Sequence, residues 1–148
     1  MITMQREVSS DVAPDVAFAY LADFTTTELW DPGTITTVRV WGDGGVGTRY
    51  RNTSRFAGRV STVDYVVTAR RPGRSIDLRG ENASVILRDT ITVAARQTGC
   101  VITYRVTFAF QGWLRWIEPL LRPAVTRLVD DGVRGLRGEL RRLGEQGI

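Results

Sequence analysis

The sequence predicts an α+β fold in which one long helix covers a curved antiparallel sheet. Six segments between residues 35 and 110 are rich in β-branched and aromatic residues, and short turn sequences such as GDGG and RRPGR separate them. Turns this short favour antiparallel neighbours over parallel strands joined by helical crossovers. Beyond residue 119 the apolar residues recur at spacings of three and four, which is typical of an amphipathic helix.

Length and composition predict a single domain spanning residues 1–148. A chain of 148 residues buries roughly 68–70% of its unfolded surface, which is enough for a core and a cavity. Hydrophobic residues make up 43% and charged residues 24%, as in ordinary globular proteins. No apolar run approaches the roughly 20 residues that span a bilayer, and the amino terminus lacks the pattern of a secretory signal. We therefore expect a soluble, cytoplasmic protein.

The first 30 residues predict a strand followed by two short helices. Residues 2–9 alternate in part and read as a strand. Pro14 and Asp15 suit a helix start, where a missing N–H costs nothing and a carboxylate meets the positive end of the helix dipole. The residues expected on the buried face of this helix are Val16, Ala17, Tyr20, Leu21 and Phe24. A second helical turn is expected at residues 26–29, and it must end before Pro32, because the residue before a proline avoids the helical region.

Alternation within the strands assigns a face to each side chain. The expected strands are 35–41, 48–56, 60–70, 75–80, 84–94 and 101–110. In the second of them, one side carries Arg49, Arg51 and Arg55, and the other carries Tyr50, Asn52, Ser54 and Phe56. In the last, Arg105 faces water and the inward side carries Ile102, Tyr104, Val106, Phe108 and Phe110.

The carboxy-terminal helix is expected to begin between Pro119 and Pro123, since proline suits a helix start and not its middle. Its apolar face would consist of Leu121, Val125, Leu128, Val129, Gly132, Leu136, Leu140 and Leu143. The arginines that fall largely on the opposite face are Arg122, Arg127, Arg134, Arg137 and Arg141. Three glycines interrupt the helix, and each lowers helix propensity by roughly 1 kcal/mol. Close approach of a strand or a ligand would explain them, and so would a kinked or frayed helix.

The residue types that are absent exclude several kinds of chemistry. The chain has no histidine, which removes the usual general base and the commonest metal ligand. Its one cysteine, Cys100, is expected to be a small structural residue. No acidic cluster suggests a metal site, and GDGG falls in a hairpin, so no nucleotide-binding loop is indicated. We therefore expect no metal and no cofactor.

The order of elements resembles the helix-grip fold of the START-like superfamily, also called SRPBCC or Bet v 1-like, which includes polyketide cyclases and dehydrases. Three local stretches carry the resemblance: VAFAYLADF with LWDPG (16–33), ARRPGRSIDLRG (69–80), and RDTITVA paired with TGCVITYRVTF (88–108). The resemblance covers nearly the whole chain. It implies a sheet of about seven strands wrapped around the long helix, with a cavity between them that takes a small organic molecule.

A ligand in that cavity would contact the side chains that alternation turns inward. The ligand-binding residues predicted on this basis are Trp30, Tyr50, Asn52, Ser54, Asp89, Tyr104 and Phe108. Asn52 and Ser54, on the same face as Tyr50, are the best sign of a cavity, because polar groups in a solid core cost roughly 1–3 kcal/mol each when unsatisfied. Trp30 has a second interpretation, as packing at the corner where the helical region gives way to a strand.

Three residues are candidates for catalysis. Asp89 shares a face with apolar neighbours, and a buried carboxyl group has a raised pKa that suits acid or base chemistry. Alternatively, a bulge turns it outward or an arginine pairs with it. Tyr50 and Tyr104 could polarise a carbonyl group or hold an enolate, or they could be core aromatics with satisfied hydroxyls.

The leading functional hypothesis is binding of a hydrophobic or aromatic small molecule, with a polyketide cyclase or aromatase as its enzymatic form. A non-enzymatic carrier of a lipid, quinone or polyketide is the alternative. A weaker one is a basic interaction module, suggested by the formal charge of +4, although the arginines are dispersed and no nucleic-acid partner is expected.

Trp113 and Trp116, near Arg115 and Arg122, would contact a membrane surface, rim the cavity or cover the end of the core. Monomer and homodimer are both left open.

Overall fold

The computed structural model describes residues 1–146, and its centre is a seven-stranded antiparallel sheet in the order β1-β7-β6-β5-β4-β3-β2. The strands are β1 (Ile2–Ser10), β2 (Thr34–Trp41), β3 (Arg49–Phe56), β4 (Arg59–Arg71), β5 (Ser75–Glu81), β6 (Val85–Ala95) and β7 (Cys100–Phe110). The helices are α1 (Pro14–Ala22), η1 (Phe24–Thr26), α2 (Thr27–Trp30), η2 (Gly112–Ile117) and α3 (Glu118–Gln146). The predicted α+β helix-grip class is confirmed, and so is each predicted strand, with its ends shifted by no more than a residue or two.

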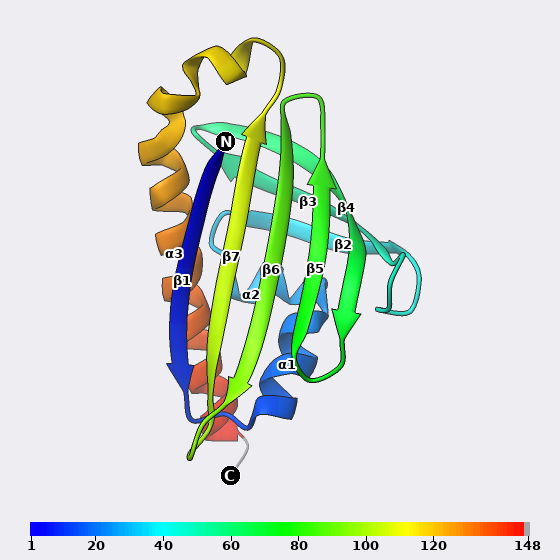
Figure 1. Cartoon of the computed structure of the whole chain (residues 1–148), viewed down its shortest axis with the longest axis vertical. Helices are drawn as coiled ribbons and strands as arrows, with labels where there is room; N and C mark the ends of the chain where they lie inside the picture. The colour runs from blue at the N-terminus through cyan, green and yellow to red at the C-terminus, as the bar shows by residue number, and fades with distance from the viewer. Residues whose placement is uncertain (147–148) are drawn as a thin grey trace.

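The sheet is strongly curved, and this curvature makes room for a cavity. In Figure 1, β2 and β3 run across the direction of β5, β6 and β7, while α3 runs lengthwise beside β1. Register shifts interrupt the pairing of β2 with β3 and of β4 with β5. Such irregularities bend a strand and increase its twist. The concave side of the sheet therefore faces α2 and α3.

The predicted strand faces are confirmed. Along β3, the three arginines are exposed, and the side chains of Tyr50 and Asn52 on the other face are buried. Along β7, Ile102, Val106 and Phe108 are buried while Arg105 is exposed. Alternation was reliable here because one side of the sheet is covered and the other meets water.

The buried face of α1 differs from the prediction. Val16 is 49% exposed and Tyr20 is only partly buried, whereas Phe18 and Ala22 are buried. The Arg70 guanidinium lies 5.3 Å from the centroid of the Phe18 ring. Positions 16 and 18 lie on opposite sides of a helix with about 3.6 residues per turn, so the buried face of α1 is turned by roughly a quarter of a turn from the predicted one.

The long helix begins earlier than predicted. It starts at Glu118, so Pro119 lies in its first turn and Pro123 lies inside the helix. The missing N–H of Pro123 would have bonded the carbonyl of Pro119, and this single loss near the start is tolerated. The structure also adds Val133 to the predicted buried face. Among residues 1–146, no helix combines the length and the apolar character needed to cross a membrane.

Candidate functional site

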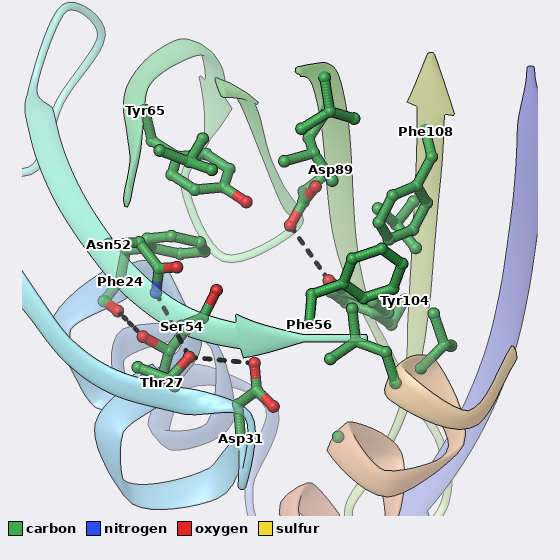
Figure 2. A pocket seen from close by; sticks show the side chains of 18 of the residues that line it. Phe24, Thr27, Asp31, Asn52, Ser54, Phe56, Tyr65, Asp89, Tyr104 and Phe108 are labelled. Atoms are coloured by element: carbon green, nitrogen blue, oxygen red, sulfur yellow. Dashed lines mark hydrogen bonds between the residues drawn. The ribbon is translucent and has the colours of Figure 1, made fainter. Parts of the chain in front are cut away.

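A cavity of about 100 Å³ lies between the concave side of the sheet and α3. Its walls are mainly apolar and aromatic, with a few polar groups, which is typical of small-molecule sites. Six of the seven predicted ligand-binding residues line it: Trp30, Asn52, Ser54, Asp89, Tyr104 and Phe108. Trp30 comes from α2, and Figure 2 shows the side chains of the other five, which come from β3, β6 and β7.

Asp89 is the buried carboxyl group of this cavity. Its side chain is only 3% exposed, and the Tyr104 hydroxyl donates a hydrogen bond to Oδ2 at 3.0 Å. The other oxygen, Oδ1, is buried without a hydrogen-bond partner among the described residues. Burial raises the pKa of Asp89 to about 7, with a smaller contribution from the charge of Asp31, while the hydrogen bond from Tyr104 opposes the rise. Neither a bulge nor an arginine removes Asp89 from the interior.

Asp31 is a second carboxyl group in the wall of the cavity, and the sequence interpretation missed it. Its Oδ1 accepts a hydrogen bond from the Gly33 amide, and its Oδ2 accepts one from the Thr34 hydroxyl, both at 3.0 Å. Burial raises the pKa of Asp31 above its ordinary value, and those two hydrogen bonds oppose the rise. The Asp-Pro-Gly sequence indicated a turn, and nothing local indicated that the turn would face a cavity.

Tyr65 of β4 is a second missed residue of the site. Figure 2 shows its hydroxyl directed toward the Asp89 carboxyl group, and it makes no hydrogen bond to the other residues drawn there. Its ring lies over Gly80 on the neighbouring strand, where an added Cβ would come within 2.6 Å of a ring carbon. The signal for Tyr65 was present, because alternation of Val63, Tyr65 and Val67 turns all three inward.

Trp30 is both a corner residue and part of the cavity wall. It is buried, its ring packs edge-on against Tyr104 at 6.1 Å between centroids, and its Nε1 has no partner within residues 1–146. The corner lies against α3 at Gly135, where an added Cβ would meet the Trp30 carbonyl oxygen. Close approach thus explains Gly135, although the approaching segment is the end of α2 and not a strand.

The polar residues of β3 form part of a hydrogen-bonded network. The Asn52 amide donates to the Thr37 hydroxyl at 2.8 Å and to that of Thr34 at 3.3 Å. The hydroxyls of Thr37 and Thr27 lie 2.6 Å apart. The NH₂ group of Asn52 is therefore paired within the protein, whereas Asp89 Oδ1 is a fully buried acceptor of the cavity with no partner among residues 1–146.

Tyr50 is buried but does not line the cavity. Its ring packs against Phe24, with 5.6 Å between centroids, and Phe24 in turn contacts Tyr65 at 4.8 Å. Burial raises the pKa of Tyr50. The structure thus separates Tyr50 from Asp89 and Tyr104, with which it was grouped as a catalytic candidate.

Two side chains separate the cavity from a groove on the surface. Phe56 and Leu128 line the cavity and also line a surface groove formed by this turn and α3. Phe56 stacks on Phe108 and Phe110, with centroids 6.5 and 6.2 Å apart. These three aromatic rings therefore form the wall of the cavity on the side of the groove.

The remaining predicted candidates lie outside the cavity. Cys100 is buried, and burial raises the pKa of its thiol. Trp113 and Trp116 are 68% and 76% exposed, so they do not cover the core, and Arg115 lies over the Trp116 ring. No group of three or more potential metal ligands occurs in the part of the chain that the structure describes.

Comparisons with known proteins agree with this architecture. The model of a family described as "Polyketide cyclase / dehydrase and lipid transport" matches residues 1–141. No curated protein matches the chain in sequence.

Several solved structures have the same fold. Zhui aromatase/cyclase from Streptomyces sp. R1128 superposes with a TM-score of 0.81 at 16% identity, over 95% of this chain and 94% of that one. A START superfamily protein from Mycobacterium smegmatis gives a TM-score of 0.78 at 10% identity, over 95% and 98%. A point mutant of norcoclaurine synthase from Thalictrum flavum, in complex with a transition-state analogue, gives 0.65 at 16% identity, over 95% and 96%. At these identities the likeness is one of fold.

Proposed function

Because the chain belongs to the polyketide cyclase / dehydrase and lipid transport family, we propose that it is a cyclase- or aromatase-like enzyme acting on a small aromatic or hydrophobic molecule. The substrate would occupy the cavity between the sheet and α3, and Asp89 would transfer protons. Two proteins with the same fold, an aromatase/cyclase and norcoclaurine synthase, are named as enzymes, which is consistent with this proposal.

The observation that carries the proposal is the unpaired Oδ1 of Asp89 in a mainly apolar cavity. A carboxyl group there lowers stability, because its charged form loses hydration and the protein offers only one hydrogen bond in return. A passive container for apolar molecules needs no such group. A pKa of about 7 lets Asp89 accept and return protons near neutral pH, which is the condition for efficient general acid–base catalysis.

The chemistry we propose is proton removal beside a carbonyl group, followed by ring closure. Ionised Asp89 takes a proton from a carbon next to a ketone, and the electrons of that C–H bond form the C=C bond of an enolate. The enolate carbon attacks a second carbonyl carbon in the same molecule, and the resulting alkoxide takes the proton back from Asp89. The new hydroxyl then leaves with a hydrogen from the neighbouring carbon as water, which gives the unsaturated ring.

Two tyrosines would assist Asp89 in different ways. Tyr104 is a positioning residue, since its hydroxyl holds Oδ2 and leaves Oδ1 free to face the substrate. The Tyr65 hydroxyl, which is directed toward Asp89, is suited to donate a hydrogen bond to the enolate oxygen. The cavity itself would hold the reacting carbons close together, which alone can supply much of a rate enhancement.

Proton abstraction can be tested before the natural substrate is known. We would first record native mass spectra of the gently purified protein and identify any co-purified molecule after denaturing extraction. The exchange of the α-protons of phenylacetone in D₂O, followed by NMR, then measures carbon-acid chemistry directly. We expect the wild type to exceed Asp89→Asn by about 10²–10⁴-fold in the exchange rate.

Matched variants separate catalysis from stability. Asp77 has an Oδ1 that is also buried without a partner among the described residues, but it does not line the cavity, so Asp77→Asn should exchange like wild type. Tyr104→Phe removes the hydrogen bond that lowers the pKa of Asp89, so its pH–rate profile should move to higher pH. Wild-type exchange rates in a folded Asp89→Asn variant would refute the proposal.

A non-enzymatic carrier is the second candidate, favoured by the exposed apolar residues that follow β7. Trp113, Trp116 and Leu120 are 68%, 76% and 77% exposed, and they begin three residues after Phe110, which lines the cavity. A carrier that exchanges its ligand with a membrane would use such a surface. If the protein is such a carrier, Asp89→Asn should leave its affinity for the ligand unchanged, and the wild type should show no α-proton exchange above background.

A further inference from the structure

We propose that the cavity selects an aromatic ligand carrying a protonated nitrogen, an aryl-alkyl ammonium, which would pair with Asp89. This inference rests on the proposed function, because it assigns a substrate class to the same site. It follows from the charges in the cavity wall, from the aromatic rings around them and from the size of the space.

The charges in the wall are of one sign. Asp89 and Asp31 both line the cavity, and none of the lining residues is an arginine. Asp31 has hydrogen bonds on both oxygens, whereas Asp89 has a buried oxygen with no partner within residues 1–146. Two buried groups of the wall lack partners among the described residues, the donor Trp30 Nε1 and the acceptor Asp89 Oδ1. Only Asp89 can become charged, and the ligand group that satisfies an anionic acceptor best is a cationic N–H donor.

The groups that face Asp89 from other elements do not neutralise it. Tyr104 comes from β7, Tyr65 from β4 and Asp31 from the corner after α2, and all three remain neutral or become negative. The contribution of α3 to the wall is apolar, from side chains such as Val129 and Val133 and from Gly132. A bound ammonium would thus be the one positive charge in the cavity.

The aromatic lining suits the same ligand. Seven aromatic side chains line the cavity, among them Trp30 and Tyr104, which pack edge to face. Aromatic faces attract a desolvated cation by about 2 kcal/mol or more, and rings that surround an ammonium recur in proteins that bind such groups. The same rings would stack on an aromatic ligand.

An anionic ligand would be opposed by this arrangement. A carboxylate in the cavity would lie beside two carboxyl groups with no basic side chain to offset them. A neutral alcohol could donate a hydrogen bond to Asp89 but would gain no ion pair. The expected order of affinity is therefore ammonium, alcohol, carboxylate.

The volume limits the ligand to about one ring. Ligand sites usually measure roughly 300–1,000 Å³, and this cavity measures about 100 Å³. A cavity of about 150 Å³ admits benzene, so lining side chains such as Phe56 must move outward before this smaller space takes even one aromatic ring. The probes for the test should therefore be single-ring compounds of matched length.

The test compares phenethylammonium, 2-phenylethanol and phenylacetate by isothermal titration calorimetry and thermal shift. We expect the ammonium to bind about tenfold or more tightly than the alcohol near pH 8, and phenylacetate not to bind at about 10 mM. Because the pKa of Asp89 is about 7, the affinity for the ammonium should rise from about pH 6 to about pH 8. Asp89→Asn should lower the affinity for the ammonium about tenfold and leave that for the alcohol within about threefold.

A second variant and separate readouts keep the inference open to refutation. If Asp89→Asn does not fold, Asp31→Asn replaces it, with a smaller expected loss for the ammonium alone. Equal affinities for the three probes, tighter binding of phenylacetate, or no ammonium binding at about 10 mM would overturn the inference. If phenylacetate binds as tightly as the ammonium while exchange of phenylacetone still requires Asp89, this inference fails and the proposed function stands. If the ammonium is preferred while exchange does not require Asp89, the proposed function fails and the charge selectivity stands.

Discussion

Asp89 shows how one residue can be destabilising and still be the centre of a site. Its position in β6 is an apolar one by alternation, between Leu87 and Ile91, which are both buried. A valine or leucine at this position would extend the apolar core, and no charged group would lose its hydration. The Tyr104 hydrogen bond reduces the penalty of the aspartate but leaves Oδ1 unpaired.

The raised pKa makes stability depend on pH in a predictable direction. Between about pH 4 and pH 7 the folded state keeps a proton on Asp89 that the unfolded state releases, so the free energy of unfolding falls as pH rises through this window. A shift from 3.8 to about 7 corresponds to a loss on the order of 4 kcal/mol, complete above pH 7. Asp89→Asn should remove this loss.

Guanidinium denaturation at pH 5 and pH 8 checks this expectation. The comparison of wild type with Asp89→Asn matters more than either profile alone, because Asp31 has a raised pKa and Glu139 a lowered one, and these shifts remain in both proteins. Parallel profiles for the two proteins would show that Asp89 titrates normally in the folded state.

At the scale of elements, the contact between α2 and α3 places the corner of the site. Gly135 lets the Trp30 carbonyl approach the helix, and Gly132 lies one turn earlier beside Trp30 and Asp31. The glycines therefore fix how deeply the Trp30-Asp31 corner enters between helix and sheet. Both residues of that corner line the cavity.

Two glycines of α3 should respond oppositely to alanine. At Gly135 an added Cβ would meet the Trp30 carbonyl oxygen, so Gly135→Ala must displace the corner and should destabilise by about 1–3 kcal/mol. At Gly138 nothing lies within 4 Å, so Gly138→Ala should stabilise by up to about 1 kcal/mol through helix propensity. Chemical denaturation measures both, and Trp fluorescence reports displacement of Trp30. Equal effects of the two substitutions would contradict the role given to Gly135.

The elements themselves could be predicted because each has a strong local pattern. The strands alternate, and Asn52, Ser54, Asp89 and Tyr104 were placed toward the interior from alternation alone. The start of α3 was predicted too late, because a proline was expected only at a helix start and Pro123 lies inside the helix. So close to the first turn, the proline removes a single helical hydrogen bond, and the helix tolerates this loss. The short α1 was rotated from the expected face, so Phe18 replaced Val16 in the core.

The rest of the site depends on contacts between distant segments. Asp31 enters the cavity wall only because the corner packs against α3, roughly a hundred residues further along the chain. Tyr50 and Tyr65 both face inward, and their alternation is equally clear, so no local pattern could tell which one reaches the cavity. The packing of Phe24 between them decides it.

For the whole molecule, the size of the cavity follows from how the two ends of the sheet close on α3. The sheet curves from β1, which lies beside α3, to β3, whose end meets the helix again at Phe56 and Leu128. Phe56 stacks on two further phenylalanines of β7. The aromatic stack therefore borders the cavity on this side, and the space inside measures about 100 Å³.

Shortening Phe56 should change the size of the ligand that the molecule accepts. In Phe56→Leu the stack on Phe108 is lost and the space beside it widens, so a two-ring probe such as 2-naphthylethanol should bind. The wild type should bind 2-phenylethanol and should not bind 2-naphthylethanol. Phe18→Leu is the matched control, because Phe18 is buried on α1, outside the cavity wall, and its loss should lower stability without changing ligand size. Calorimetric titration of both probes into the three proteins measures the selectivity. If the wild type already binds 2-naphthylethanol as tightly as 2-phenylethanol, then α3 and the β3–β4 turn separate readily in solution, and Phe56 does not set the size limit.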